Sequence, residues 1–225
     1  MTTACQTLSE DRLNPPVRGF LHRPEHGAGD GLVLAHGAGS NSNSPLLITV
    51  AGAFAGSGMT VLRCDLPYRQ NRSYGPPRPG EAERDRDGLR NAVTVLRKLG
   101  CGRIFVGGHS YGGRQATMLC AAEPDLVAGL LLLSYPLHPP RKPEQLRVQH
   151  LPKLQVPALF VHGTRDPFGS VEEMESALTM IPAKTELLRV EGAGHDLGFK
   201  AKAMPEELVG SVVRAFSDFF GELGR

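Results

Sequence analysis

The sequence predicts an α/β fold, in which a mostly parallel sheet of about seven strands carries helices on both faces. Short apolar runs alternate with longer amphipathic segments, which indicates repeated strand–helix–strand units. Some runs, such as LVLA at 32–35 and ALFV at 158–161, are apolar throughout, as expected of strands covered on both faces. With 225 residues, 40% of them hydrophobic, the chain can build one sizeable core, so we expect a single domain over residues 1–225.

The predicted elements follow one another in regular order after a segment, 1–16, that we expect to be irregular. Apolar runs predict the strands, and the amphipathic segments between them predict the helices. The strands are VRGFLH (17–22), GLVLAH (31–36), MTVLRC (59–64), RIFVGG (103–108), AGLLLLSY (128–135), PALFVHG (157–163) and TELLRV (185–190). The helices are about 45–56, 81–99, 111–122, 171–180 and 205–222.

Two long connections interrupt this regularity, at 65–80 and 135–156, and both are rich in proline. Long proline-rich connections in a compact α/β domain are more often lids or walls of a site than linkers. A solvated surface loop is the alternative for each. Because its prolines disfavour a long helical cap, segment 135–156 is predicted to be a short lid-like insertion.

The composition excludes several classes of partner. A net charge of +2 gives no argument for binding nucleic acid or a membrane surface. No stretch approaches the length of an apolar membrane span, and the start MTTACQTLSEDRLNPP lacks the regions of a signal peptide.

The four cysteines form no C-x-x-C pair, so neither a zinc cluster nor another metal or cofactor is expected. Free thiols indicate a reducing compartment, and we predict a cytoplasmic location.

The heptapeptide GGHSYGG at 107–113 predicts a nucleophile. It follows an apolar strand and precedes a helix, and a serine at such a bend takes strained backbone angles. Glycine two residues before and two after Ser110 lets neighbouring backbone approach without a Cβ clash. Such a bend would expose Ser110 Oγ above the carboxyl edge of the sheet. The alternative interpretation of the heptapeptide is a plain glycine-rich turn without a catalytic role.

A serine nucleophile needs a base, and the base needs an orienting acid. His195 lies in the loop EGAGHDLGF after the last strand, from where it can reach over the sheet edge. Asp166 follows the strand ALFVHG on the same edge; turn formation by Asp-Pro is its alternative role. The order Ser110, Asp166, His195 is that of hydrolases with a strand–turn–helix nucleophile.

The oxyanion formed during attack needs two donors. Tyr111 starts the helix after Ser110, so its N–H is free, and the glycines of LAHGAGSNS (34–42) make Ala38 the second expected donor. A nucleotide-phosphate loop is excluded, because neither glycine cluster contains G-K-[ST] or G-x-G-x-x-G.

The motifs HGAGSNSN, GGHSYGG, VHGTRDPFG and GAGHD together resemble the α/β-hydrolase superfamily, over about residues 17–220. Within it, the size and the stretch RCDLPYRQ are similar to small dienelactone-hydrolase-like predicted hydrolases. These include a testis-expressed hydrolase-like protein and a scaffold subunit of a histone-acetyltransferase complex. Dienelactone hydrolases proper use cysteine as nucleophile, so their substrate does not transfer to a chain with Ser110.

The expected activity is that of a serine hydrolase which cleaves a carboxylic ester or thioester through an acyl-enzyme. The expected partner is a small acyl substrate, and the expected assembly is a monomer or homodimer. A non-enzymatic scaffold on a hydrolase fold and an acyltransferase are the alternatives. Arg69 and Arg72 leave the sheet edge that carries Ser110, so they could bind an anionic acyl group; simple solvation is the other interpretation. Arg114, one helical turn past Ser110, is expected to pair with a structural carboxylate.

Overall fold

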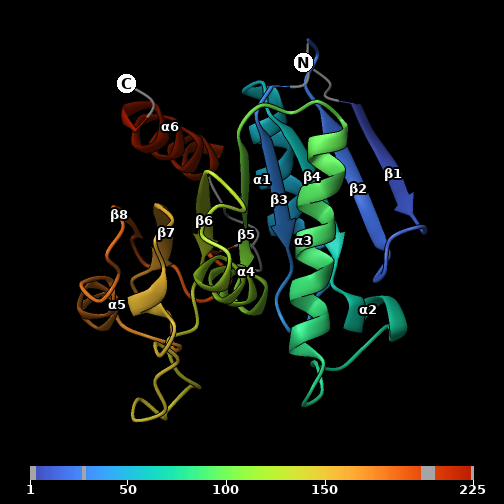
Figure 1. Ribbon diagram of the computed structural model, residues 1–225. Coiled ribbons are helices and arrows are strands. Elements are labelled where there is room, and N and C mark those ends of the chain that lie inside the picture. Colours follow the sequence, from blue (N-terminus) through green and yellow to red (C-terminus); the bar gives the residue numbers. More distant parts are fainter. Residues whose placement is uncertain (1–3, 27–28, 199–205, 224–225) are drawn as a thin grey trace.

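One sheet contains all eight strands of the computed structural model, which describes residues 4–26, 29–198 and 206–223 (Figure 1). The strands lie in the spatial order β1-β2-β4-β3-β5-β6-β7-β8. Their bounds are β1 Ala4–Glu10, β2 Val17–Arg23, β3 Gly31–Ala35, β4 Thr60–Asp65, β5 Ile104–His109, β6 Gly129–Leu133, β7 Ala158–Gly163 and β8 Thr185–Val190.

The sheet is mostly parallel, as the alternation of strands and helices predicted. From β4 through β3, β5, β6 and β7 to β8 every neighbouring pair is parallel, whereas β1 and β2 add an antiparallel edge. The carboxyl ends of the parallel strands therefore meet at one edge of the sheet. In open α/β sheets this edge is where ligands bind.

Helices cover both faces of the sheet. Figure 1 shows α3 crossing in front of the sheet and α1 behind it. The core on one face includes side chains of α3, α4 and α5, and the core on the other includes side chains of α1 and α6. The bounds are α1 Pro45–Gly56, α2 Pro67–Asn71, α3 Ala82–Lys98, α4 Tyr111–Ala122, α5 Val171–Leu178 and α6 Glu206–Glu222.

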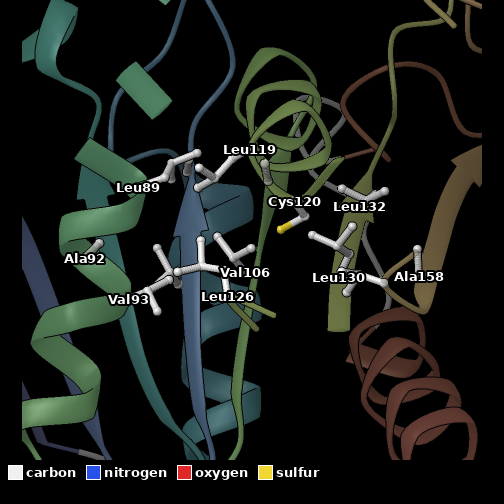
Figure 2. Close-up of a cluster of buried hydrophobic side chains, with 14 of the residues drawn as sticks. Leu89, Ala92, Val93, Val106, Leu119, Cys120, Leu126, Leu130, Leu132 and Ala158 are labelled. Atoms are coloured by element: carbon white, nitrogen blue, oxygen red, sulfur yellow. The ribbon is translucent and has the colours of Figure 1, made fainter. Parts of the chain in front are cut away.

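Successive residues of the central strands pack into the two cores in turn. In β3, Leu32 and Leu34 belong to the core under α1 and α6, and Val33 and Ala35 belong to the opposite core. Figure 2 shows the core that contains Val33 and Ala35, where Val93 of α3 and other side chains of α3, α4 and β6 converge. Burial on both faces explains why these strands are apolar throughout.

The expectation that segment 1–16 is irregular is corrected for residues 4–10, and the described residues form eight strands where about seven were expected. Residues 4–10 form β1, which pairs with β2 alone at the edge of the sheet. Most of its side chains are exposed, so the strand carries no apolar run that the sequence could reveal. The short helix α2 was also not predicted, because it lies inside the proline-rich connection 65–80.

Segment 135–156 contains no α-helix among its residues, only a 3₁₀ turn at Leu151–Lys153. Tyr135, Leu137, Leu151 and Leu154 are buried in the core, so the segment packs onto the body of the protein. This is the small insertion that its prolines predicted. None of the helices in the described ranges is long and apolar enough to cross a membrane.

Candidate active site

Ser110 occupies the single residue between the end of β5 and the start of α4. Its backbone is strained, with φ 51° and ψ −114°. A Cβ at Gly108 would lie 2.1 Å from the Ala35 carbonyl oxygen, and one at Gly112 would lie 2.7 Å from the same atom. Glycine is therefore required on both sides of the serine, because β3 and its following loop run directly alongside.

Three side chains from three loops meet at the carboxyl edge of the sheet. His195 Nε2 lies 2.8 Å from Ser110 Oγ, and His195 Nδ1 lies 2.8 Å and 3.0 Å from the two carboxylate oxygens of Asp166. An ionised carboxylate only accepts hydrogen bonds, so Nδ1 carries the proton and Nε2 accepts from the serine hydroxyl. The structure thus brings together the three residues that the sequence singled out.

The carboxylate of Asp166 is fully buried, whereas 20% of the His195 side chain is exposed. Besides His195, the backbone N–H of Phe168 donates to Asp166 Oδ1 at 2.9 Å. The Phe168 ring stacks on the imidazole, with centroids 4.0 Å apart. These contacts fix the plane of the imidazole, which a proton shuttle between serine and substrate requires.

The loop of His195 is held by a second histidine. His109 Nε2 donates to the carbonyl oxygen of His195 at 2.7 Å. Burial lowers the pKa of His109 to about 4, so its ring is neutral at physiological pH and can serve as this fixed donor. The position of the imidazole is therefore tied to the strand end that also carries Ser110.

The two residues expected to supply oxyanion donors, Ala38 and Tyr111, line the same cavity as Ser110. Tyr111 is the first residue of α4, where the N–H has no acceptor within the helix. The Tyr68 hydroxyl lies 2.8 Å from the Ala38 carbonyl and 3.2 Å from the Gly37 carbonyl, which belongs to the peptide that carries the Ala38 N–H. Asp85, completely buried, accepts hydrogen bonds from Tyr68 N and from the Tyr111 hydroxyl. Asp85 therefore connects α2, whose Tyr68 contacts Ala38, with α4, whose first residue is Tyr111.

A cavity of about 790 Å³ opens at this edge and includes Ser110 and His195 in its lining. This volume is typical of a site for a small molecule. Leu46, Pro136 and Phe168 contribute apolar wall. Pro136 belongs to the insertion 135–156, which therefore forms part of the wall of the site.

Arg69 and Arg72 do not line this cavity. The guanidinium of Arg69 turns inward and donates to four backbone carbonyls, and Arg72 pairs with Glu81 at 2.6 Å. This corrects the interpretation that either arginine binds substrate, and the buried Arg69 is not simply solvated either. Arg69 instead connects its own loop, at Arg72 and Gly75, with the loop after β3, at Ala38 and Ser40.

Arg114 and Arg147 line the cavity instead. Within the described part of the chain neither forms an ion pair, so the carboxylate partner expected for Arg114 is not found. The spacing of Arg114, which lies four residues after Ser110 on a helix, is a sequence signal for this location. Arg147 lies in a segment without periodicity, and no sequence signal marks it. Over the described residues, no group of histidine, cysteine or acidic side chains could hold a metal ion.

A parallel sheet with a strained serine between a strand and a helix defines the class of α/β hydrolases. A family model described as "Alpha/beta hydrolase domain" matches residues 28–220, and the chain therefore belongs to the α/β-hydrolase family. The superfamily resemblance that the motifs indicated is confirmed. The likeness to the testis-expressed protein and to the acetyltransferase-complex subunit stays a prediction.

Among curated proteins, the esterase Rv0045c of Mycobacterium tuberculosis is 32% identical over 113 residues. The match covers 48% of this chain and 33% of that esterase, so it spans about a third of the relative's length. Two solved structures are similar over nearly their whole length. A dienelactone hydrolase from Anabaena variabilis has a TM-score of 0.73 at 21% identity, with 99% of each chain covered. Est1E from Butyrivibrio proteoclasticus with ferulic acid bound has a TM-score of 0.73 at 18% identity, covering 95% and 99% of the chains.

Proposed function

We propose that the protein is a serine hydrolase that cleaves a carboxylic ester or thioester. The observation that carries this proposal is the 2.8 Å contact between Ser110 Oγ and His195 Nε2, with Asp166 on the other imidazole nitrogen. In the proposed roles Ser110 is the nucleophile, His195 the general base and Asp166 the residue that orients it. The same arrangement is the one that serine hydrolases on unrelated folds share.

The proposed reaction has two halves. His195 Nε2 takes the Ser110 proton while Oγ attacks the carbonyl carbon, and the resulting oxyanion accepts from the N–H groups of Ala38 and Tyr111. The imidazolium then gives its proton to the leaving alcohol or thiol, and an acyl-serine remains. Water repeats the sequence: His195 takes its proton, the hydroxide attacks the acyl group, and Ser110 Oγ recovers a proton as the acid leaves.

The environment of the triad supports these roles. The ionised form of Asp166, stabilised by two hydrogen-bond donors, favours the imidazolium that forms in each transition state. The apolar wall from Leu46 and Phe168 suits the carbon chain of an acyl group. The esterase relative from Mycobacterium tuberculosis also supports ester cleavage, as does membership of a hydrolase family.

A cytoplasmic location is part of the same proposal. All four cysteines, Cys5, Cys64, Cys101 and Cys120, are free. Free thiols persist where the medium is reducing.

The test is labelling by a fluorophosphonate probe together with hydrolysis of 4-nitrophenyl esters. We expect the probe to modify Ser110, and Ser110→Ala to lose labelling and to lower kcat by a factor on the order of 10⁶. A folded Ser110→Ala protein that keeps a tenth of the wild-type activity would contradict the assignment. Wild-type protein that is folded but neither labels nor turns over any ester would favour the scaffold alternative. Faster transfer to an added alcohol than to water would indicate an acyltransferase.

A further inference from the structure

Two arginines share the cavity of Ser110 without a carboxylate partner. Arg114 projects from the second turn of α4, and Arg147 comes from the insertion 135–156. Within the described residues neither guanidinium forms an ion pair, and the buried Nε of Arg114 has no hydrogen-bond partner. An arginine without a carboxylate partner at a half-buried position is unusual, because burial removes part of the hydration of its charge.

The backbone around Arg147 is firmly placed. Its N–H donates to the Leu137 carbonyl at 2.7 Å, and its own carbonyl accepts from the Tyr135 hydroxyl at 3.1 Å. Tyr135 is 1% exposed and belongs to the core, so this part of the insertion is fixed on the body of the protein. Arg114 is fixed equally well by the helix that follows the nucleophile, because its N–H donates to the Ser110 carbonyl at 2.9 Å. Both guanidinium groups therefore start from rigid positions.

Arg114 and Arg147 line the same cavity, so their like charges repel each other. Burial, and then the charge of Arg114, lowers the pKa of Arg147. The neighbouring His150 adds no further positive charge, because burial and then Arg114 and Arg86 lower its pKa to about 4 and leave it neutral. An anion between the two arginines would remove the repulsion and pair with both.

The shape of the guanidinium group favours a carboxylate as this anion. Each arginine offers a planar fork of N–H donors, which matches the two oxygens of a carboxylate. Among the described lining residues outside the triad, Asp196 is the acidic one, and a ligand with one negative charge is repelled less by it than a phosphate monoester, which carries nearly two.

We propose that Arg114 and Arg147 bind a carboxylate carried by the ester substrate, so that the preferred substrate is an anionic ester. This inference rests on the proposed function, since it takes Ser110 to be the nucleophile at the same cavity. The carboxylate belongs either to the acyl part, as in a monoester of a dicarboxylic acid, or to the alcohol part. In both cases the apolar wall accommodates the carbon skeleton between the two ends.

The experiment compares kcat/KM for two matched substrate pairs. The acyl pair is 4-nitrophenyl hexanoate and the 4-nitrophenyl monoester of adipic acid. The alcohol pair is methyl 4-acetoxybenzoate and 4-acetoxybenzoate. We expect the wild-type enzyme to prefer the anionic member of one pair, and that pair identifies which part of the substrate carries the charge.

Arg114→Gln and Arg147→Gln should each reduce this preference by roughly tenfold or more, because a charge-assisted hydrogen bond is lost. The preference of Arg114→Lys for the anionic substrate should lie between those of the wild type and Arg114→Gln, since lysine keeps the charge but loses the planar fork. Arg141→Gln is the matched control: it removes the same charge from the same insertion at an exposed position outside the cavity lining, so the preference should stay. A change below about twofold in both glutamine variants, or an equal loss on both members of each pair, overturns the inference.

A binding measurement separates failure of this inference from failure of the proposed function. Adipate is titrated calorimetrically into Ser110→Ala, alone and combined with Arg114→Gln or Arg147→Gln. We expect the arginine substitutions to weaken adipate binding by roughly tenfold. If the wild type hydrolyses neutral esters but these substitutions leave adipate binding unchanged, the carboxylate site is wrong and the hydrolase stands. If adipate binding depends on the arginines but no ester is hydrolysed, the site stands and the hydrolase is wrong.

Discussion

The guanidinium of Arg69 donates a hydrogen bond of 2.7 Å to the carbonyl oxygen of Ser40, on the loop that follows β3. The same side chain donates to the carbonyls of Ala38 and Gly75, and only 7% of the residue is exposed. Ala38 is the proposed oxyanion donor. Arg69 is therefore a positioning residue, which connects the loop of α2 with the loop that faces Ser110.

Arg69→Gln should lower kcat on neutral and anionic esters alike, by about tenfold, while KM changes little. The Ala38 N–H then no longer points at the oxyanion, which exists only in the transition state. Steady-state kinetics on both substrate pairs provide the measurement, and Arg69→Lys should recover part of the loss. Arg72→Gln, which removes a charge beside Glu81, serves as control for the loop. A selective loss on anionic esters in Arg69→Gln would return this arginine to the role of substrate binder.

Ser110 is held at φ 51°, so its conformation should lower the stability of the protein. Glycine adopts such angles without strain, and Ser110→Gly should exceed Ser110→Ala in unfolding free energy by about 1 kcal/mol. Chemical denaturation of the two variants measures the difference. The control is Ser57, the residue after α1, with φ −87°: there glycine should have no advantage over alanine. Equal stability of the two Ser110 variants would show that the bend stores no strain.

The parts of the fold that follow from burial could be predicted from the sequence. The helix expected at 111–122 is α4, Tyr111–Ala122, and the run ALFV forms the first four residues of β7. Such elements are visible because burial on both faces of the sheet demands apolar residues. β1 does not require apolar residues, since it pairs on one side only and most of its residues are exposed. An edge strand of this kind has no signal in the sequence.

The candidate site also contains residues that the sequence predicts and residues that it does not. Ser110, Asp166 and His195 follow the ends of strands, so topology alone brings them to one edge. The orientation of the arginines depends on contacts that no residue type marks. Arg69 binds backbone carbonyls, which every residue carries, and so its inward turn has no counterpart in the sequence. Arg147 reaches the cavity only because the irregular insertion packs on Tyr135.

Acid should destabilise the protein through His22, which accepts a hydrogen bond of 2.8 Å from Arg63 Nε and is 4% exposed. Burial, and then the charge of Arg63, lowers the pKa of His22 from 6.5 to about 4. Above pH 6.5 the ring is neutral in the folded and unfolded chains, and it adds no pH dependence. Between pH 6.5 and 4 the unfolded chain binds a proton that the folded chain excludes, so the unfolding free energy falls as the pH falls.

Denaturation at a series of pH values measures this loss. His22→Gln should make the fall between pH 6.5 and 4 shallower, because glutamine accepts from Arg63 without titrating. The fall should not vanish, since burial also lowers the pKa of His109 and His150 to about 4. The exposed His26 is the matched control, and His26→Gln should leave the profile unchanged. An unchanged profile in His22→Gln would mean that His22 is protonated in the folded protein.

The last prediction concerns Asp166 and His195, whose side chains are 2.8 Å apart. Asp166 contacts no substrate in the proposed mechanism and acts only by orienting and stabilising the imidazole. Once His195 is removed, Asp166 has nothing left to orient. Asp166→Asn and His195→Ala should therefore each cause a large loss of kcat, and the double variant should be no worse than about the histidine variant alone. The measurement is kcat for a 4-nitrophenyl ester in the two single variants and the double variant.

As a control, Arg69→Gln combined with His195→Ala should multiply their two losses, because the Ala38 donor acts on the oxyanion independently of the base. Losses of Asp166→Asn and His195→Ala that also multiply would place the aspartate outside the catalytic unit, despite its contact with the histidine.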